Sequence, residues 1–190
     1  MNTPAHLIFG LSAFGRPDSG KVTAGALAGA LIPDASLYLL SVWHLWILGT
    51  PAQTVFGELY FSESWQAIFR VDNSFVVWGL LLSVAIMAKS RWAIALCGAA
   101  LLHLLMDFPF HNDDAWSHFW PITNWKFVSP VSYWDPAHFG SIVSVAELLL
   151  VLGLSVWLWR RFTGGWMRGL IGLLASLQIA PVVIWALMFS

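Results

Sequence analysis

Long apolar runs separated by short polar segments dominate the chain. Four of these runs approach the roughly 20 residues that a membrane-spanning helix needs, and a fifth lies near the C-terminal end. The runs cover residues 22–49, 74–89, 92–108, 140–159 and 166–189. We therefore expect an all-α protein, a polytopic transmembrane bundle of about five helices that forms a single integral membrane domain over residues 1–190.

Two features modify this simple pattern. Pro33 lies inside the first run, and because proline removes a helix hydrogen bond we expect a broken or kinked helix there. Residues 4–15 are apolar but too short to span a bilayer. They predict a re-entrant or interfacial segment that precedes the first spanning helix.

Composition supports a membrane protein and limits its chemistry. The chain is 58% hydrophobic and only 10% charged, which leaves too few polar side chains to solvate a globule of 190 residues. The net charge of −1 gives no case for nucleic acid as a partner. Cys97 is the only cysteine, so a metal would need nitrogen and oxygen ligands. The N-terminal sequence lacks a basic region and a small-residue cleavage pattern, so we expect no removable signal peptide.

The positive charges indicate an orientation in the membrane. Of the nine lysines and arginines, only Arg70 and Lys126 fall on one side of a five-helix threading. The other side holds Arg16, Lys21, Lys89, Arg91, Arg160, Arg161 and Arg168. Because cytoplasmic loops carry the excess of positive charge, the N-terminus is predicted to be cytoplasmic. The loops 50–73 and 109–139 would then face the periplasm or exterior.

The loop 109–139 is unusually rich in histidine, aspartate, tryptophan and proline. Its prolines restrict the backbone to extended or turn geometry, and its aromatic rings suit the level of the lipid headgroups. We therefore expect an ordered cap on the membrane surface.

His103 and Asp107 are the most informative pair in the sequence. They lie four residues apart near the end of the third run, so both side chains project from one face of a helix. Ionisable groups at such depth are costly unless a cation or a mutual hydrogen bond compensates them. The pair favours metal ligation. The alternative is that His103 donates to a carbonyl of a neighbouring helix and Asp107 caps the helix end.

Two further residues are candidates for the same cation. Asp34 follows Pro33 within the first run, where an unpaired carboxylate requires a proton, a cation or a basic partner. It could instead cap a break in the helix. His6 lies in the short N-terminal segment and is either a ligand or a packing residue.

Several other polar residues remain open to more than one role. His111, Asp113, Asp114 and His118 could support the site, form a second metal site or be solvated loop residues. Glu147 lies within the fourth run, where it could act as a general base or as a polar contact between helices.

Short motifs give a family resemblance over about the first 110 residues. The chain resembles the inner-membrane metal-dependent hydrolase family of the LexA-regulated type. The matching elements, in order, are "TPAH" at 3–6, Pro33 with Asp34, Asn73 with Ser74, and His103 with Asp107. The resemblance implies a bacterial inner-membrane hydrolase with a bound metal.

The chain departs from the family pattern at two places. Ala35 and Ser36 follow Asp34 where the family has an acidic residue, and Asn73 stands where it has a histidine. Asparagine is a poor ligand for transition metals. If the resemblance holds, either the lost donor is replaced by Asp72, His111 or His118, or the metal is bound weakly or not at all.

The sequence therefore predicts one divalent cation, with zinc expected, at His6, Asp34, His103 and Asp107. Asp72, Glu147 or His118 would serve as the base, and a lipid or lipid-linked ester or phosphoester would enter from the bilayer. The alternative is a non-catalytic membrane scaffold, accessory protein or transporter subunit. An ion-coupled transporter using Asp34 and Glu147 would need two symmetric halves, which are not evident.

Overall fold

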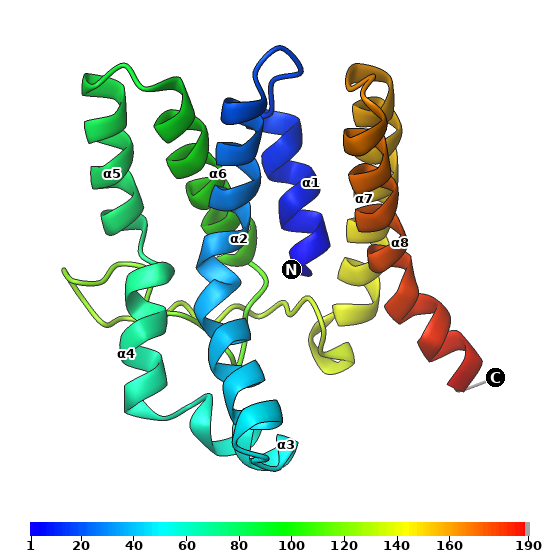
Figure 1. Cartoon of the computed structure of the whole chain (residues 1–190). Helices are drawn as coiled ribbons and strands as arrows, with labels where there is room; N and C mark the ends of the chain where they lie inside the picture. Colours follow the sequence, from blue (N-terminus) through cyan, green and yellow to red (C-terminus); the bar gives the residue numbers. More distant parts are fainter. Residues whose placement is uncertain (189–190) are drawn as a thin grey trace.

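The computed structural model describes residues 1–188, with side chains as far as Ile179, and every regular element in this part is helical (Figure 1). The all-α prediction is confirmed over these residues. The end of the fifth apolar run, at 189, lies outside them. The elements are α1 (Thr3–Phe14), α2 (Gly20–Val42), a π-helical turn (Trp43–Ile47), α3 (Ala52–Thr54), a second π-helical turn (Val55–Leu59), α4 (Glu63–Asp72), α5 (Phe75–Met87), α6 (Arg91–Asp107), a 3-10 turn (Pro136–His138), α7 (Gly140–Arg161) and α8 (Gly165–Met188).

Three helical stretches are long and apolar enough to cross a membrane. They are Gly20–Ile47, Glu63–Met87 and Gly140–Arg161. Helix α5 carries exposed Leu80, Val84 and Met87, and an outward-facing apolar surface of this kind suits contact with lipid. The helices are thus compatible with membrane association.

Helix α2 runs through Pro33 without interruption, so of the two predicted outcomes the break is wrong and the kink stays a prediction. The helix starts at Ser19, whose hydroxyl accepts a hydrogen bond from the Val22 amide (3.4 Å). Proline is tolerated inside membrane helices because neighbouring groups compensate the lost backbone bond. The helical hydrogen-bond pattern changes only at Trp43, ten residues later.

The short N-terminal segment forms an interior helix. Helix α1 packs against α2, α6, α7 and α8, and it runs beside α2 and α6 (Figure 1). Ala5, Ile8 and Leu11 are fully buried along it. An interfacial position on the membrane surface therefore does not describe α1, which leaves the re-entrant alternative.

Small residues allow α2 and α6 to approach closely. A Cβ atom at Gly29 would lie 1.9 Å from the carbonyl oxygen of Leu96, and one at Gly25 would lie 2.7 Å from that of Trp92. Glycines spaced by four residues bring two helix backbones into direct contact, as is common in membranes. This contact fixes the relative position of Asp34 on α2 and His103 on α6.

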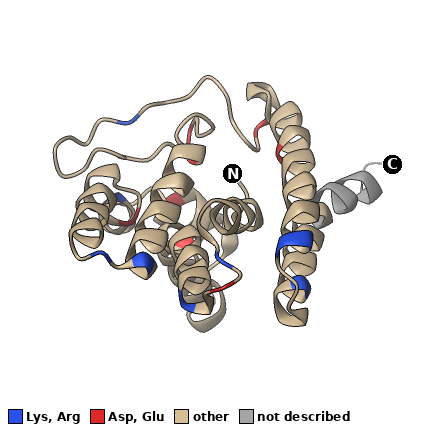
Figure 2. Cartoon of the chain, turned by 90° about the horizontal axis from the view of Figure 1, so that it is seen from above, with Lys and Arg blue, Asp and Glu red and all other residues tan. Residues whose placement is uncertain are grey.

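The turns α1–α2, α5–α6 and α7–α8 lie at the same end of the bundle, which is the upper end in Figure 1. The seven lysines and arginines assigned to one side by sequence lie in or next to these turns. Figure 2 views the chain from this end, with α7 and α8 beside the other helices. The seven basic residues thus lie at one end of the bundle, as the sequence predicts. The cytoplasmic location of this end remains a prediction.

The connection between α6 and α7 crosses the other helices below the ends of α1 and α6 (Figure 1). Backbone hydrogen bonds fix its path: Phe75 N–H donates to the His118 carbonyl (2.8 Å), and Ser129 N–H donates to the His111 carbonyl (2.9 Å). Trp116 and His118 are buried. Non-helical backbone near a membrane requires such internal partners.

Candidate metal centre and its cavity

His103 is held in one orientation by the backbone of α2. Its Nδ1 lies 2.8 Å from the carbonyl oxygen of Ala30. Because a carbonyl oxygen only accepts hydrogen bonds, Nδ1 carries the proton. The Nε2 atom then faces Asp107 Oδ2 at 3.1 Å and Asp34 Oδ1 at 3.6 Å. A lone pair that faces two carboxylates requires a second proton on the ring or a shared cation.

His6 lies directly against His103. The two imidazole rings are stacked with centroids 3.6 Å apart and planes 12° apart. His6 Nε2 lies 3.0 Å from Asp107 Oδ1, and neither ring nitrogen of His6 has a hydrogen-bond partner of acceptable geometry. Both histidines are at least 98% buried. Buried polar atoms in proteins are normally paired, so these nitrogens indicate a ligand.

His6, His103 and Asp107 together form a group that could hold a metal ion. One ligand atom from each residue lies within 4.8 Å of the others, and all three side chains are buried. The amino nitrogen of Met1 also lies 2.5 Å from Asp107 Oδ1. Two imidazoles and a carboxylate are a ligand set that suits Zn²⁺ and leaves a coordination position for water.

Asp34 stands at the edge of this group and has its own supporting contacts. The Thr3 hydroxyl donates to Asp34 Oδ2 (2.6 Å), and the Tyr38 hydroxyl donates to Thr3 Oγ1 (2.5 Å). This chain of hydrogen bonds connects α1 with one face of α2. It leaves Asp34 Oδ1 directed towards His103. Such outer contacts orient metal ligands in many proteins.

His111 approaches Asp107 from the loop after α6. Its Nε2 lies 3.5 Å from Asp107 Oδ1, and its Nδ1 lies 2.9 Å from Asp114 Oδ2. A carboxylate at one ring nitrogen fixes the tautomer and leaves the other nitrogen as an acceptor or ligand. Of the three replacements suggested for the missing family histidine, His111 alone makes this contact.

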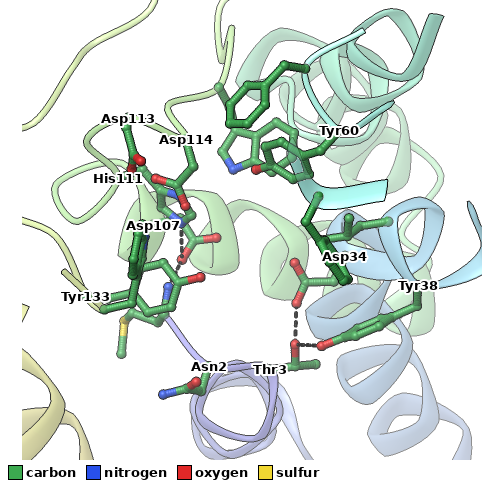
Figure 3. Close-up of a pocket in the computed structure, with 16 residues that line it drawn as sticks. Asn2, Thr3, Asp34, Tyr38, Tyr60, Asp107, His111, Asp113, Asp114 and Tyr133 are labelled. Atoms are coloured by element: carbon green, nitrogen blue, oxygen red, sulfur yellow. Dashed lines mark hydrogen bonds and ion pairs between the residues drawn. The ribbon is translucent and has the colours of Figure 1, made fainter. Parts of the chain in front are cut away.

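A cavity of about 600 Å³ opens beside the cluster (Figure 3). Asp107 and Asp34 both line it, so the buried cluster reaches the cavity through these two carboxylates. Residues from α1, α2, the segment after α3 and the α6–α7 loop complete the wall. They are Met1, Asn2, Thr3, Leu37, Tyr38, Phe56, Tyr60, Phe61, His111, Asp113, Asp114, Trp116, Tyr133 and Trp134.

Glu147 belongs to a polar contact between helices and does not line this cavity. Its Oε1 atom accepts hydrogen bonds from the Asn2 backbone amide (3.1 Å), from Asn2 Nδ2 (2.8 Å) and from Gln178 Nε2 (2.7 Å). The carboxylate thereby joins the start of α1 to α7 and α8. Its contacts correspond to the second of the two roles considered for it from the sequence.

Asp72, Asn73 and His118 also lie outside the cavity lining. The Asn73 amide donates to the Phe69 carbonyl (3.1 Å) and to the Pro33 carbonyl (3.4 Å). His118 Nδ1–H donates to the Asn73 carbonyl (2.9 Å). Burial lowers the pKa of His118 to about 4, despite this bond, so the ring is neutral at pH 7.

No family model, no curated protein and no solved structure matches this chain. The resemblance to the inner-membrane hydrolases therefore stays a prediction. The arrangement of the site is therefore the basis for inferring a function.

Four residues that contact the site or line its cavity were not predicted from the sequence. Two of them had a weak sequence signal, and two had none. Tyr38 is one helical turn beyond Asp34, and Thr3 is close to one turn before His6, so their positions on the same faces could have been noticed. Tyr60 and Tyr133 reach the cavity from irregular segments. No periodicity predicts contacts of that kind.

Proposed function

We propose that this chain is a membrane-embedded metal-dependent hydrolase that acts on a lipid or lipid-linked ester or phosphoester. The observation that supports this most directly is the convergence of His6 Nε2, His103 Nε2 and the Asp107 carboxylate, all buried, beside a cavity that Asp107 lines. Hydrolysis needs an activated water next to a space for substrate. The cluster offers ligands for a metal that would activate the water, and the cavity offers the space.

A divalent ion such as zinc, when bound, supplies a Lewis acid and lowers the pKa of a water molecule towards neutrality. His6, His103 and Asp107 would hold it and leave a position for water, and Asp34 on α2 stands beside them, 3.6 Å from His103 Nε2. The Ala30 carbonyl keeps the His103 Nε2 lone pair available for this purpose. Thr3 and Tyr38 keep the Asp34 carboxylate in place.

His111 is the group best positioned to accept a proton from the attacking water. Its side chain lines the cavity, its Nε2 lies 3.5 Å from Asp107 Oδ1, and Asp114 lies at its Nδ1. An imidazole oriented by a carboxylate is a common general base. Asp72, Glu147 and His118, which were candidates for this role, lie outside the cavity lining.

The location of the cavity favours a lipid substrate. It lies beside helices that are long and apolar enough to cross a membrane, and Leu37, Phe56 and Phe61 provide an apolar part of its wall. A lipid could place its acyl chains against such a surface while its ester or phosphoester reaches Asp107. A bacterial inner membrane, with the loops 50–73 and 109–139 in the periplasm, remains our proposal for the location.

One specific feature favours a second candidate, a non-catalytic scaffold or transporter subunit. Asp107 contacts His6, His103 and the Met1 amino nitrogen within 3.1 Å, so a protonated network could compensate its charge without a metal. In that case the cluster would hold α1 against α6 and have no chemical role.

Metal analysis separates the two candidates. Detergent-purified wild type should contain about one zinc or other divalent ion per chain, and a variant with His103→Ala and Asp107→Ala should contain none. A matched control is the exposed pair His138 and Asp135, which also contains an imidazole and a carboxylate in contact (2.6 Å). Its double alanine variant should retain the metal. Metal-free wild type, after growth and purification with added zinc, would favour the scaffold.

A positive metal result is to be followed by an activity screen. Wild type and both double variants would be incubated with short-chain lipid esters and phosphoesters in mixed micelles. Release of the head group or fatty acid by wild type and by the His138/Asp135 control, with loss in the His103/Asp107 variant, is the expected outcome. A folded, metal-loaded protein without activity on any member would contradict the hydrolase assignment.

A further inference from the structure

The cavity beside the cluster is strongly acidic. Four carboxylates line it, those of Asp34, Asp107, Asp113 and Asp114, and no lysine or arginine is among its lining residues. A divalent ion at the cluster would compensate two negative charges. Asp114 would then share only the His111 imidazole (2.9 Å), and Asp113 has no ion-pair partner among the described residues, which favours a second positive charge nearby.

Aromatic rings line the same cavity as these two carboxylates. The rings of Tyr60 and Trp116 are 5.6 Å apart with planes inclined by 59°, so they form a corner of the cavity. Tyr133 packs on His111 with centroids 5.0 Å apart. Figure 3 shows Asp113, Asp114 and Tyr133 on one side of the space and Tyr60 on the other. Faces of tyrosine and tryptophan attract organic cations.

The two tyrosine hydroxyls are neutral donors or acceptors. Burial and the nearby Asp114 carboxylate raise the pKa of both Tyr60 and Tyr133 above the ordinary value. They therefore add no negative charge to the cavity, and the attraction for a cation comes from the carboxylates and the ring faces.

Three buried atoms in this part of the wall have no hydrogen-bond partner of acceptable geometry. They are Asp114 Oδ1 and both ring nitrogens of His111. The His111 side chain is only 8% exposed and lines the cavity. Unpaired polar atoms at such burial are uncommon in proteins, and here they lie next to the space that a ligand would fill.

From these observations we infer that the cavity selects substrates with an ammonium head group. The ammonium, primary or quaternary, lies between Asp113, Asp114 and the rings of Tyr60 and Trp116. The ester or phosphoester of the same molecule lies towards Asp107. The substrate class is thus a zwitterionic, amine-bearing lipid. This inference rests on the proposed function for the reacting bond, whereas binding of the head group is independent of hydrolysis.

Two other occupants fit the wall less well. An anionic head group such as glycerol phosphate would bring a negative charge next to Asp113 and Asp114, where the cavity wall offers no lysine or arginine. A second metal ion would need at least three ligand atoms close together. Within the described residues His6, His103 and Asp107 are the only such group, and the aromatic faces next to Asp114 offer no metal ligand.

Calorimetric titration of metal-loaded, detergent-purified protein with soluble head groups tests the inference. The probes are phosphocholine, phosphoethanolamine, glycerol phosphate and choline chloride. We expect the two zwitterionic phosphates to bind at least tenfold more tightly than glycerol phosphate. Asp113→Asn combined with Asp114→Asn should abolish this preference, and Asp135→Asn, which changes a carboxylate outside the cavity lining, should retain it. Equal affinity for all phosphates in wild type would overturn the inference.

Two further readouts separate the possible failures. Loss of a second metal equivalent in the Asp113/Asp114 variant would identify a second ion as the occupant and overturn the ammonium assignment. Choline binding that depends on Asp113 and Asp114 in a protein without metal or activity would support the head-group site while contradicting the proposed hydrolase function. Trp116 lies in the wall, so quenching of tryptophan fluorescence by ligand provides a second measurement of the same binding.

Discussion

The Ala30 carbonyl determines which nitrogen of His103 faces the cluster. It lies on α2, accepts the Nδ1 proton at 2.8 Å and leaves Nε2 towards Asp107. The ligand orientation on α6 therefore depends on the position of α2. Outer contacts of this type typically change metal affinity or activity by about 10- to 100-fold when removed.

Removal of metal should lower the thermal stability of the folded protein. A ligand that binds only the native state at 100 times its Kd adds about 2.7 kcal/mol to the unfolding free energy. We expect a chelator to lower the Tm of wild type and added zinc to restore it. The variant with His103→Ala and Asp107→Ala should not respond. A wild-type Tm that is unchanged by chelator, in protein shown to contain metal beforehand, would contradict this site.

Gly29→Ala should disturb the site without changing any candidate ligand. The new Cβ would meet the Leu96 carbonyl oxygen at 1.9 Å, so α2 and α6 must separate. Overpacking of this kind costs about 1–3 kcal/mol, and it would also displace Ala30 from His103. Metal titration should show weaker binding. Gly79→Ala on α5 is the control, because a Cβ there has no neighbour within 4 Å.

Tyr38→Phe should weaken activity while the helices remain intact. The Tyr38 hydroxyl donates to Thr3, which donates to Asp34, so the substitution removes the outer support of that carboxylate. We expect metal affinity or kcat to fall by about 10- to 100-fold, with unchanged circular dichroism. Ser83→Ala removes an exposed hydroxyl on α5 and should have no effect. An effect of equal size at Ser83 would indicate a general loss of packing.

Acid should destabilise the protein partly through His118. The pKa of His118 is near 4 in the fold, against an ordinary value of 6.5, so the unfolded chain binds a proton first as the pH falls. The stability that His118 contributes is present above pH 6.5 and is lost between 6.5 and 4, by on the order of 3 kcal/mol. Tm measured from pH 7 to 4.5 should fall less steeply in His118→Gln. Parallel curves for the two proteins would contradict the assignment.

The membrane orientation can be measured with reporter fusions. A reporter that is active only in the periplasm should be active after Asp114, in the α6–α7 loop, and inactive after Lys89, in the α5–α6 turn. The expectation follows from the excess of positive charge at the end of the bundle that contains Lys89. The opposite pattern would place the cavity on the cytoplasmic side.

Helix positions and the central pair of the site could be predicted from the sequence, because both depend on local spacing. The apolar runs became helices, and His103 with Asp107 at one-turn spacing lies on one face of α6. The break considered at Pro33 does not occur, since a local rule about proline ignores the neighbours that support a membrane helix.

The rest of the site depends on tertiary contacts that have no sequence period. Nothing in the short segment 4–15 indicates that four helices surround it and stack His6 on His103. His111 is an exception, because it follows Asp107 by four residues, the same spacing that joins His103 to Asp107. It was one of several open candidates in the loop, and this spacing was the signal that could have singled it out.

The Glu147 contact has a consequence for the order in which the protein is made. Asn2 precedes Glu147 by 145 residues and is therefore synthesised before it, and Gln178, which shares the same carboxylate oxygen, follows later still. The bonds that join the start of α1 to α7 and α8 can therefore form only after both later helices have been made. The helix that carries His6 is thus secured at its start after α2 and α6, its other neighbours, have been synthesised.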